Sequence, residues 1–228
     1  MNQEQYKKLS DHFIQKSELK QLVYRQTLET FSTLKTSAEN IIGELKKDLE
    51  EQKSELDLYY SNIGSYEAEM RFAGDALLLQ MHTNVFAFPE EHFIYNSNKV
   101  QADVQNGYFG MILIYNFLAD SLRFNRFADV GYLLGRIFVN KDMNFFVQGR
   151  RQLSFLYQDF DNQFFNENVA RDIVQNAMGQ AIDFDLFVPP FDDVKEVTLQ
   201  QRIVQQGNTA IKTGKRLGFI YNSAEGET

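Results

Sequence analysis

The strongest constraint on the fold is a proline-free stretch from Leu28 to Met70, in which apolar residues recur every three to four positions. Written as a heptad frame, its a and d positions are apolar or aromatic everywhere except at Lys35 and Gln52. This period is typical of one long amphipathic helix, and the spacing continues to about Phe86, before Pro89 must end a helix. Such an apolar edge is too long to remain in water, so we expect other helices to cover it.

We expect this edge to be the seam of an oligomer, and its predicted residues are Leu28, Phe31, Ile42, Leu45, Leu49, Leu56, Tyr59 and Ile63. Residues 3–23 are also predicted to be helical, with Tyr6, Leu9 and Phe13 on one face. These positions fall out of the later frame, so we expect a separate first helix or a bend near residues 17–25. The alternative is that the long helix folds back against its own domain.

The pattern predicts an α+β fold that is predominantly helical, with few strands. We divide the chain into an N-terminal helical or coiled-coil region (1–73), a compact C-terminal α+β domain (74–222) and a flexible tail (223–228). Apolar residues at steps of three and four predict a buried central helix over residues 100–122 and a second helix over 129–138. Three further elements are predicted: a strand at Phe145–Val147 after a turn at Asn140–Asn144, a helix opened by Asn168, and a closing strand at Leu217–Tyr221.

Composition and charge exclude several classes of protein. The 228 residues include no cysteine, which excludes disulfides, thiolate metal sites and a cysteine nucleophile. A net charge of −8 argues against general attraction to nucleic acid or to anionic membranes. No apolar run has the length of a membrane span or of a signal peptide, so we expect a cytoplasmic protein without a membrane partner.

The sequence carries no recognised catalytic or nucleotide-binding motif, and we expect no catalytic residue, metal ion or cofactor. His82 and His92, near Glu90 and Glu91, would be the acid–base groups of a hydrolase if they met. Two Asp-Phe-Asp triplets, at 159–161 and 183–185, resemble the carboxylate spacing of cation sites. Solvated side chains are the simpler interpretation of both the histidines and the triplets.

One segment of this acidic chain is basic, because residues 123–151 carry a net charge of +4. Its cations are Arg123, Arg126, Arg136, Lys141, Arg150 and Arg151. If these side chains converged, their guanidinium groups would suit phosphate oxygens. The alternative is that they pair with acidic segments of the same fold or of a neighbouring subunit.

These observations favour a non-enzymatic assembly protein. Its partner would be a second copy or another subunit of a larger complex, held by the N-terminal helix, with the C-terminal domain as a recognition surface. A ligand-responsive sensor that binds a phosphorylated, nucleotide-like molecule at the basic segment is the first alternative. A hydrolase that uses His82 or His92 is the second.

Overall fold

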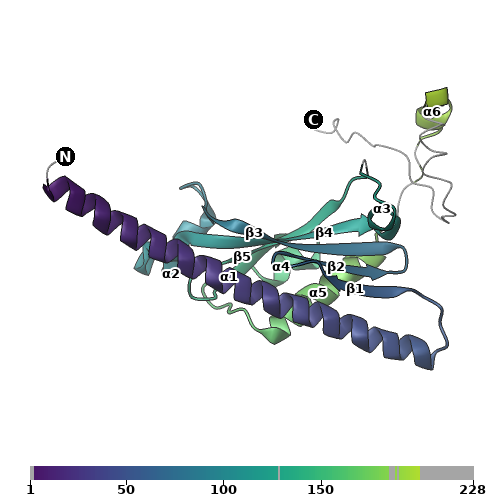
Figure 1. The fold of residues 1–228 in the computed structure, drawn as a ribbon, viewed down its shortest axis with the longest axis horizontal. Helices are drawn as coiled ribbons and strands as arrows, with labels where there is room; N and C mark the ends of the chain where they lie inside the picture. The colour runs from purple at the N-terminus through teal and green to yellow at the C-terminus, as the bar shows by residue number, and fades with distance from the viewer. Residues whose placement is uncertain (1–2, 128, 185–187, 189, 201–228) are drawn as a thin grey trace.

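A computed structural model describes residues 3–127, 129–184, 188 and 190–200. The chain begins with one long helix, α1 (Gln3–Glu51), which continues into a six-stranded sheet. The sheet is an antiparallel meander in sequence order, β1 (Leu58–Asn62), β2 (Glu67–Phe72), β3 (Asp75–Ala87), β4 (Tyr108–Leu118), β5 (Tyr132–Val139) and β6 (Phe145–Gly149). Helix α5 (Glu167–Ile182) lies beside α1 on the same face of the sheet (Figure 1).

Short helices fill the connections between these elements, and one more follows α5. They are η1 (Phe93–Asn96), α2 (Asn98–Ala102), η2 (Val104–Gly107), α3 (Ala119–Arg123), α4 (Gln152–Leu156) and α6 (Phe191–Val194). The fold is therefore α+β, as predicted, but "predominantly helical" and "few strands" were wrong for a chain with a six-stranded sheet. The predicted strand Leu217–Tyr221 and the tail 223–228 lie outside the described residues.

The long helix ends much earlier than the heptad pattern predicts. Helix α1 stops at Glu51, and Lys53 adopts a positive φ of 53° at the exit from the helix. The following apolar residues belong to strands, in which Ala68, Met70 and Phe72 alternate toward the core. A heptad pattern places some apolar residues an even number of positions apart, which is also the spacing on one face of a β-strand. The prediction of a helix to Met70 and beyond was therefore wrong from Gln52 onward.

The N-terminal part of α1 is more continuous than the sequence pattern predicts. Residues 3–51 form one continuous helix, so neither a separate first helix nor a bend near residues 17–25 is present. The change of frame in the sequence is therefore not a break in the backbone; it reflects the drift of a 3.6-residue helix relative to a strict period of seven.

The predicted buried helix over residues 100–122 is mainly the central strand β4. Its side chains alternate between the two faces of the sheet, with Ile112 and Ile114 buried beneath α1 and α5, and Met111 and Leu113 half-buried on the other face. A strand that carries apolar side chains on both faces reads as apolar all round, and periodicity alone does not separate it from a buried helix. The same ambiguity explains why β5 was predicted to be a helix.

Other predictions from local sequence were confirmed. Residues 140–144 form the turn between β5 and β6, in which the Asn140 side chain accepts hydrogen bonds from the backbone N–H groups of Asp142 and Asn144 at 3.0 and 2.9 Å. The strand predicted at Phe145–Val147 is β6. The predicted helix after Asn168 is α5, although its N-cap is Asn166, whose side chain accepts from the Val169 N–H.

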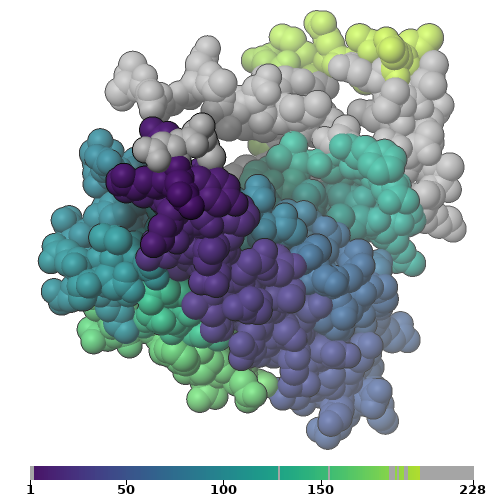
Figure 2. Space-filling model, turned by 60° about the vertical axis from the view of Figure 1, so that its left-hand side comes forward, coloured from purple at the N-terminus to yellow at the C-terminus, as the bar shows by residue number. Residues whose placement is uncertain are grey.

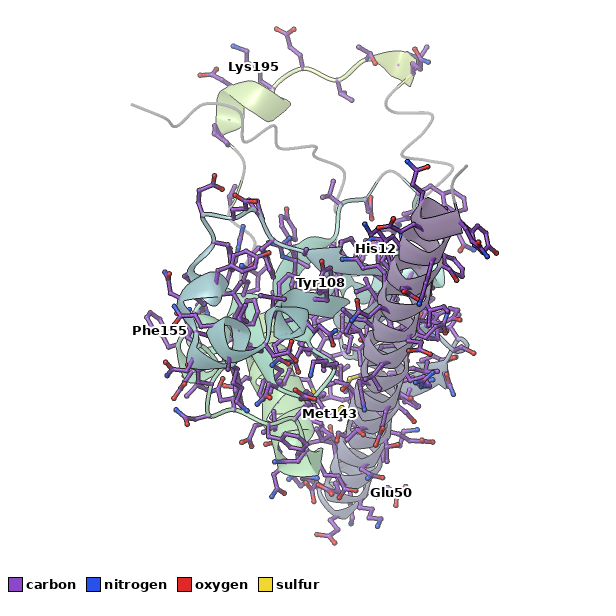
Figure 3. The ribbon with its side chains drawn as sticks, turned by 90° about the vertical axis from the view of Figure 1, so that its left-hand side faces the viewer. His12, Glu50, Tyr108, Met143, Phe155 and Lys195 are labelled. Carbon is purple, nitrogen blue, oxygen red and sulfur yellow. The ribbon has the colours of Figure 1, made fainter. Side chains whose placement is uncertain are left out.

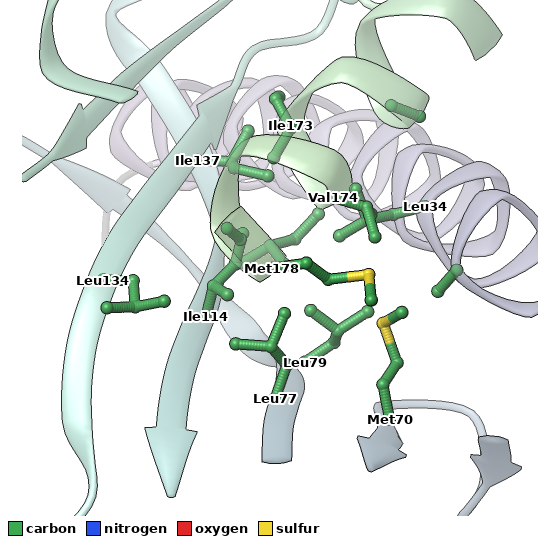
Figure 4. Close-up of a cluster of buried hydrophobic side chains, with 14 of the residues drawn as sticks. Leu34, Met70, Leu77, Leu79, Ile114, Leu134, Ile137, Ile173, Val174 and Met178 are labelled. Carbon is green, nitrogen blue, oxygen red and sulfur yellow. The ribbon is translucent and has the colours of Figure 1, made fainter. Parts of the chain in front are cut away.

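The main core lies between the sheet and the two long helices. Figure 4 shows Leu34 of α1 and Val174 and Met178 of α5 close to Leu79 and Ile114 of the sheet. A second, aromatic cluster covers one end of the opposite face, where Phe109, Phe138 and Phe146 pack under residues 88–100 and Phe160. The first core fixes where α1 lies, and it therefore fixes the surface described next.

Helix α1 approaches β4 closely at Gly110. A Cβ atom added to Gly110 would lie 1.8 Å from Thr27 Oγ1 and 2.6 Å from Thr27 Cβ. Thr27 is fully buried, and its hydroxyl donates to the Val23 carbonyl at 2.7 Å. Only glycine leaves room for α1 at this point of the sheet.

Candidate interaction surface

The docked part of α1 begins near Leu19. From there, buried residues recur along one side of the helix through Val23, Thr27, Phe31, Leu34 and Ala38 to Ile42. Just before this stretch, the Lys16 ammonium donates to the Tyr108 hydroxyl and lies 3.7 Å from the centre of that ring. Tyr108 is the first residue of β4, so Lys16 marks the point at which the helix leaves the sheet.

Residues 3–15 of α1 extend beyond the sheet, and we call them the projecting segment (Figures 1 and 3). All of them are exposed except Ser10, which is half-buried. Four large apolar side chains are exposed there, with exposed fractions of 61% for Tyr6, 56% for Leu9, 66% for Phe13 and 48% for Ile14. Figure 2 shows the space-filling surface of α1 in purple along the sheet domain.

The exposed side chains continue the stripe that faces the core. At 100° per residue, Tyr6, Leu9 and Phe13 point within about 60° of one another, in the angular sector that Thr27, Phe31 and Ala38 use against the sheet. We call these three residues the apolar stripe. This side of the helix therefore carries apolar residues both before and after Lys16 and Lys20, which interrupt it, and the sheet covers only the later ones.

The charged side chains of the projecting segment lie on its other side. Glu4, Lys7, Lys8 and Asp11 all fall more than about 120° from the middle of the apolar stripe. Glu4 and Lys8 form an exposed ion pair at 2.9 Å, one helical turn apart. The stripe is bordered by the uncharged side chains of Gln5 and Ser10, and Lys16 lies about 50° from its middle.

A groove of about 590 Å³ continues from the stripe where the helix meets the sheet. It lies between Lys20, Gln21 and Tyr24 of α1 and residues 83–86 of β3. The sheet is irregular at this point, because the pairing of β3 with β4 shifts between His82 and Phe86. Beyond it, Tyr24 and Tyr66 join α1 to the β1–β2 hairpin through their hydroxyl groups, 2.6 Å apart.

The predicted seam residues occupy several different environments. Phe31 and Ile42 are buried in the core of the same chain, and Leu28 and Leu45 pack against that core. Leu49 is half-buried in the last turns of α1. Leu56, Tyr59 and Ile63 are exposed, but they lie beyond the end of the helix. The sheet and α5 cover this part of α1, so the predicted coiled-coil seam is not seen within the described chain.

The residues predicted to bind an anion do not gather at one place. Arg123 and Arg126 both lie over the Phe124 ring, at 5.5 and 5.8 Å from its centre. Arg136 lies midway along β5, where it donates to the Gln148 side chain at 2.6 Å. The remaining three are exposed or paired at the ends of the β5–β6 hairpin, with Arg150 and Arg151 at one end and Lys141 at the other.

Lys141 pairs with acidic residues of the same fold, which was the alternative interpretation of the basic segment. Its ammonium pairs with the Asp103 and Asp142 carboxylates at 3.1 and 3.0 Å. It therefore holds the β5–β6 turn to the segment before β4.

The histidines and paired aspartates have local structural partners. His82 Nδ1 accepts from the Asn84 N–H at 3.0 Å, and His92 Nδ1 accepts from the Ile94 N–H at 3.3 Å. Burial lowers the pKa of His92, whose ring stacks on Phe88. Asp161 accepts from the backbone N–H groups of Asn98 and Lys99, which open α2.

The Asp183–Asp185 triplet was not placed completely, because Asp185 lies outside the described residues. Within residues 3–127, 129–184 and 190–200, three or more His, Asp or Glu side chains do not gather in a way that suits a metal ion. Over the same ranges, none of the helices has the combined length and hydropathy of a membrane span.

The sequence already carried the signal for the candidate surface. Tyr6, Leu9 and Phe13 share one face of a predicted helix, but nothing in the sequence shows that the sheet ends before it reaches them. Comparisons with known protein families, with curated proteins and with solved structures gave no match, so no function is carried over from a relative.

Proposed function

We propose that this chain is a non-enzymatic assembly protein, joined to its partner through the projecting segment of α1. The observation that supports the proposal is the continuity of the apolar stripe with the core-facing side of the same helix. Apart from Lys16 and Lys20, one side of α1 carries mainly apolar side chains from Tyr6 to Ile42, and the chain's own sheet covers only those after Lys16. A partner helix would cover the apolar side chains that the sheet leaves exposed.

Physical reasons favour a covered stripe. The projecting segment extends a helix that is already formed, but it lacks the tertiary packing of an amphipathic face, from which most helical stability in proteins comes. Two exposed aromatic rings and a leucine on one face add an apolar area of roughly 350 Å² that favours association. Burial of this area by a partner would stabilise both the contact and the helix itself.

The face of the sheet opposite α1 and α5 is the surface that we assign to recognition. Glu67 and Gln80 on β2 and β3 and Arg136 and Gln148 on β5 and β6 lie in one row across it, with Leu113 of β4 between the two polar pairs. Gln80 donates to Glu67 at 3.4 Å, and Gln148 lies 3.3 Å from the His92 ring. Such a half-exposed row, bordered by Leu78 and Tyr115, offers both hydrogen bonds and apolar contact to a second protein.

The test compares the mass of tagged full-length protein in cell extract and after purification. The double variant Leu9→Lys/Phe13→Lys is expected to run at the monomer mass where the wild type forms a larger species, because two ammonium groups cannot be buried in an apolar contact. Phe155→Lys is the matched control. Phe155 is 82% exposed, and Figure 3 places it on the far side of the molecule from α1.

Circular dichroism and thermal unfolding of each variant would show that the sheet domain remains folded. If the double variant keeps the mass of the wild type both in extract and after purification, the projecting segment is not the joining element.

A further inference from the structure

We infer that the partner protein places a carboxylate side chain, from an aspartate or a glutamate, on Arg136 in the open face of the sheet. This inference rests on the proposed function, because it uses the face assigned to recognition, and it adds the chemistry that the partner must bring. Two features of this face support it: a cation without a counter-ion, and a row of hydrogen-bond donors that lacks an acceptor.

Arg136 is the cation without a counter-ion. Arg71 on β2 and Arg136 on β5 both point away from the core, but their partners differ. Arg71 Nε lies 2.6 Å from an oxygen of Glu69 on the same strand. Arg136 donates to the Gln148 side chain and lies 5.4 Å from the centre of the Phe138 ring. Within the part of the chain that the structure describes, none of the acidic side chains pairs with Arg136.

Arg136 also belongs to a row of polar groups that has more donors than acceptors. His92 Nδ1 accepts from the Ile94 N–H at 3.3 Å, so the proton of the neutral imidazole lies on Nε2. This nitrogen lies 3.3 Å from Gln148 Nε2, while Gln148 Oε1 accepts from Arg136 Nη2 at 2.6 Å. The Gln148 amide thus turns a donor toward the His92 donor. If the amide were turned over, its donor would face Arg136 instead, so the row lacks one acceptor in either orientation.

A partner that covers this face must supply the missing acceptor. While the face is open, water can accept from His92, Gln148 and Arg136. A partner that packs on Leu113 and Tyr115, which are half-buried on the same face, excludes that water. Buried donors without acceptors and a buried charge without a counter-ion both weaken an interface, whereas arginine is a common anchor of interfaces when its partners are in place.

The charge of Arg136 selects a carboxylate over other acceptors. A backbone carbonyl would accept a hydrogen bond but leave the charge unbalanced, whereas a carboxylate takes two parallel hydrogen bonds from a guanidinium group and neutralises it. A polyanion such as nucleic acid is disfavoured by the net charge of −8 and by Glu67, which lies on the same face three strands away, at about 14 Å. One acidic side chain of a protein satisfies both conditions.

The test uses the full-length tagged protein in cell extract and follows its complex through a dilution series. Arg136→Glu would place two carboxylates against each other, so we expect the affinity to fall about 30-fold or more. Arg136→Lys keeps the charge but loses the paired hydrogen bonds, so its loss should be smaller. Lys46→Glu is the matched control, because it reverses a charge at an exposed position of α1, on the other side of the sheet, and should leave the affinity unchanged.

Cross-linking identifies the group that lies on position 136. A zero-length carbodiimide joins an amine only to a carboxylate in contact with it, and mass spectrometry of the digested complex locates the bond. In Arg136→Lys, the introduced amine should be joined to an aspartate or glutamate of the partner. Arg71→Lys is the positive control on the same face, since its amine should be joined to Glu69 of its own chain.

Two results would overturn the inference. One is a complex of wild-type affinity in Arg136→Glu, and the other is an amine at position 136 that stays unlinked in a complex while Arg71→Lys is joined to Glu69. In either case, loss of the complex in Leu9→Lys/Phe13→Lys would still support the proposed function. The reverse outcome, in which Arg136→Glu dissociates a complex that Leu9→Lys/Phe13→Lys leaves intact, would refute the projecting segment as the joining element and keep the inference. A wild type that forms no complex would refute both.

Discussion

Replacing Gly110 by alanine tests whether α1 lies on its own sheet, the arrangement on which the candidate surface depends. The added methyl group would lie 1.8 Å from Thr27 Oγ1 and 2.6–2.7 Å from two carbons of the same side chain. Thr27 is fully buried on a helix that is anchored on both sides of it, so it cannot turn away. Helix and strand must separate locally.

The expected cost is about 2 kcal/mol of unfolding free energy, typical of an overpacked core and reduced slightly by the better strand propensity of alanine. For a chain of this size, that lowers the midpoint of thermal unfolding by about 4–8 °C. Guanidinium unfolding of the full chain, followed by circular dichroism, would measure the change in free energy directly.

Two further variants make this experiment specific. Gly179→Ala is the matched control, because a Cβ at this exposed position in α5 meets nothing within 4 Å. It should stabilise the protein by about 0.5–1 kcal/mol, the usual gain for alanine over glycine within a helix. Thr27→Ala combined with Gly110→Ala should cost about 1 kcal/mol less than the sum of the two single changes, since the closest atom has been removed. If Gly110→Ala were neutral or stabilising, as Gly179→Ala is expected to be, α1 would not lie against β4 at this point.

Three other predictions follow from the same structure. Ile42→Lys should unfold the sheet domain, and not merely separate two chains, because Ile42 is buried in the core of its own chain. If the variant instead stays folded and has a lower mass than the wild type, Ile42 belongs to an oligomer seam, as the sequence pattern predicted. Asp161→Asn should destabilise the protein by about 1 kcal/mol through the weakened N-terminus of α2, whereas Asp159→Asn, at an exposed carboxylate, should change the unfolding free energy by less than about 0.5 kcal/mol. Burial, with a smaller contribution from Glu39, raises the pKa of Tyr60 to about 12. The phenolate absorbance that Tyr60→Phe removes from the titration of the wild type should therefore appear near pH 12 and not near pH 10. Because this folded-state pKa lies above the unfolded one, the stability that Tyr60 contributes is complete below pH 10 and is lost as the pH rises toward 12.

The sequence alone determined the features that depend on neighbouring residues. The helical character of the first fifty residues, the turn at Asn140–Asn144, the strand after it and the helix that became α5 all follow from local spacing and capping groups. Side chains such as Asn140 and Asn166 bond to backbone groups only a few residues away. Their effect is therefore the same whatever the rest of the chain does.

The tertiary structure decided which apolar faces are covered. The apolar residues of β4 fit either a helix or a strand, and only pairing with β3 and β5 selected the strand. The heptad pattern predicted that the stripe on α1 needs cover, but the sheet and α5, not another helix of a coiled coil, provide it after Lys16. Burial depends on residues distant in sequence, and for this reason no local pattern showed that Tyr6, Leu9 and Phe13 would be the residues left outside.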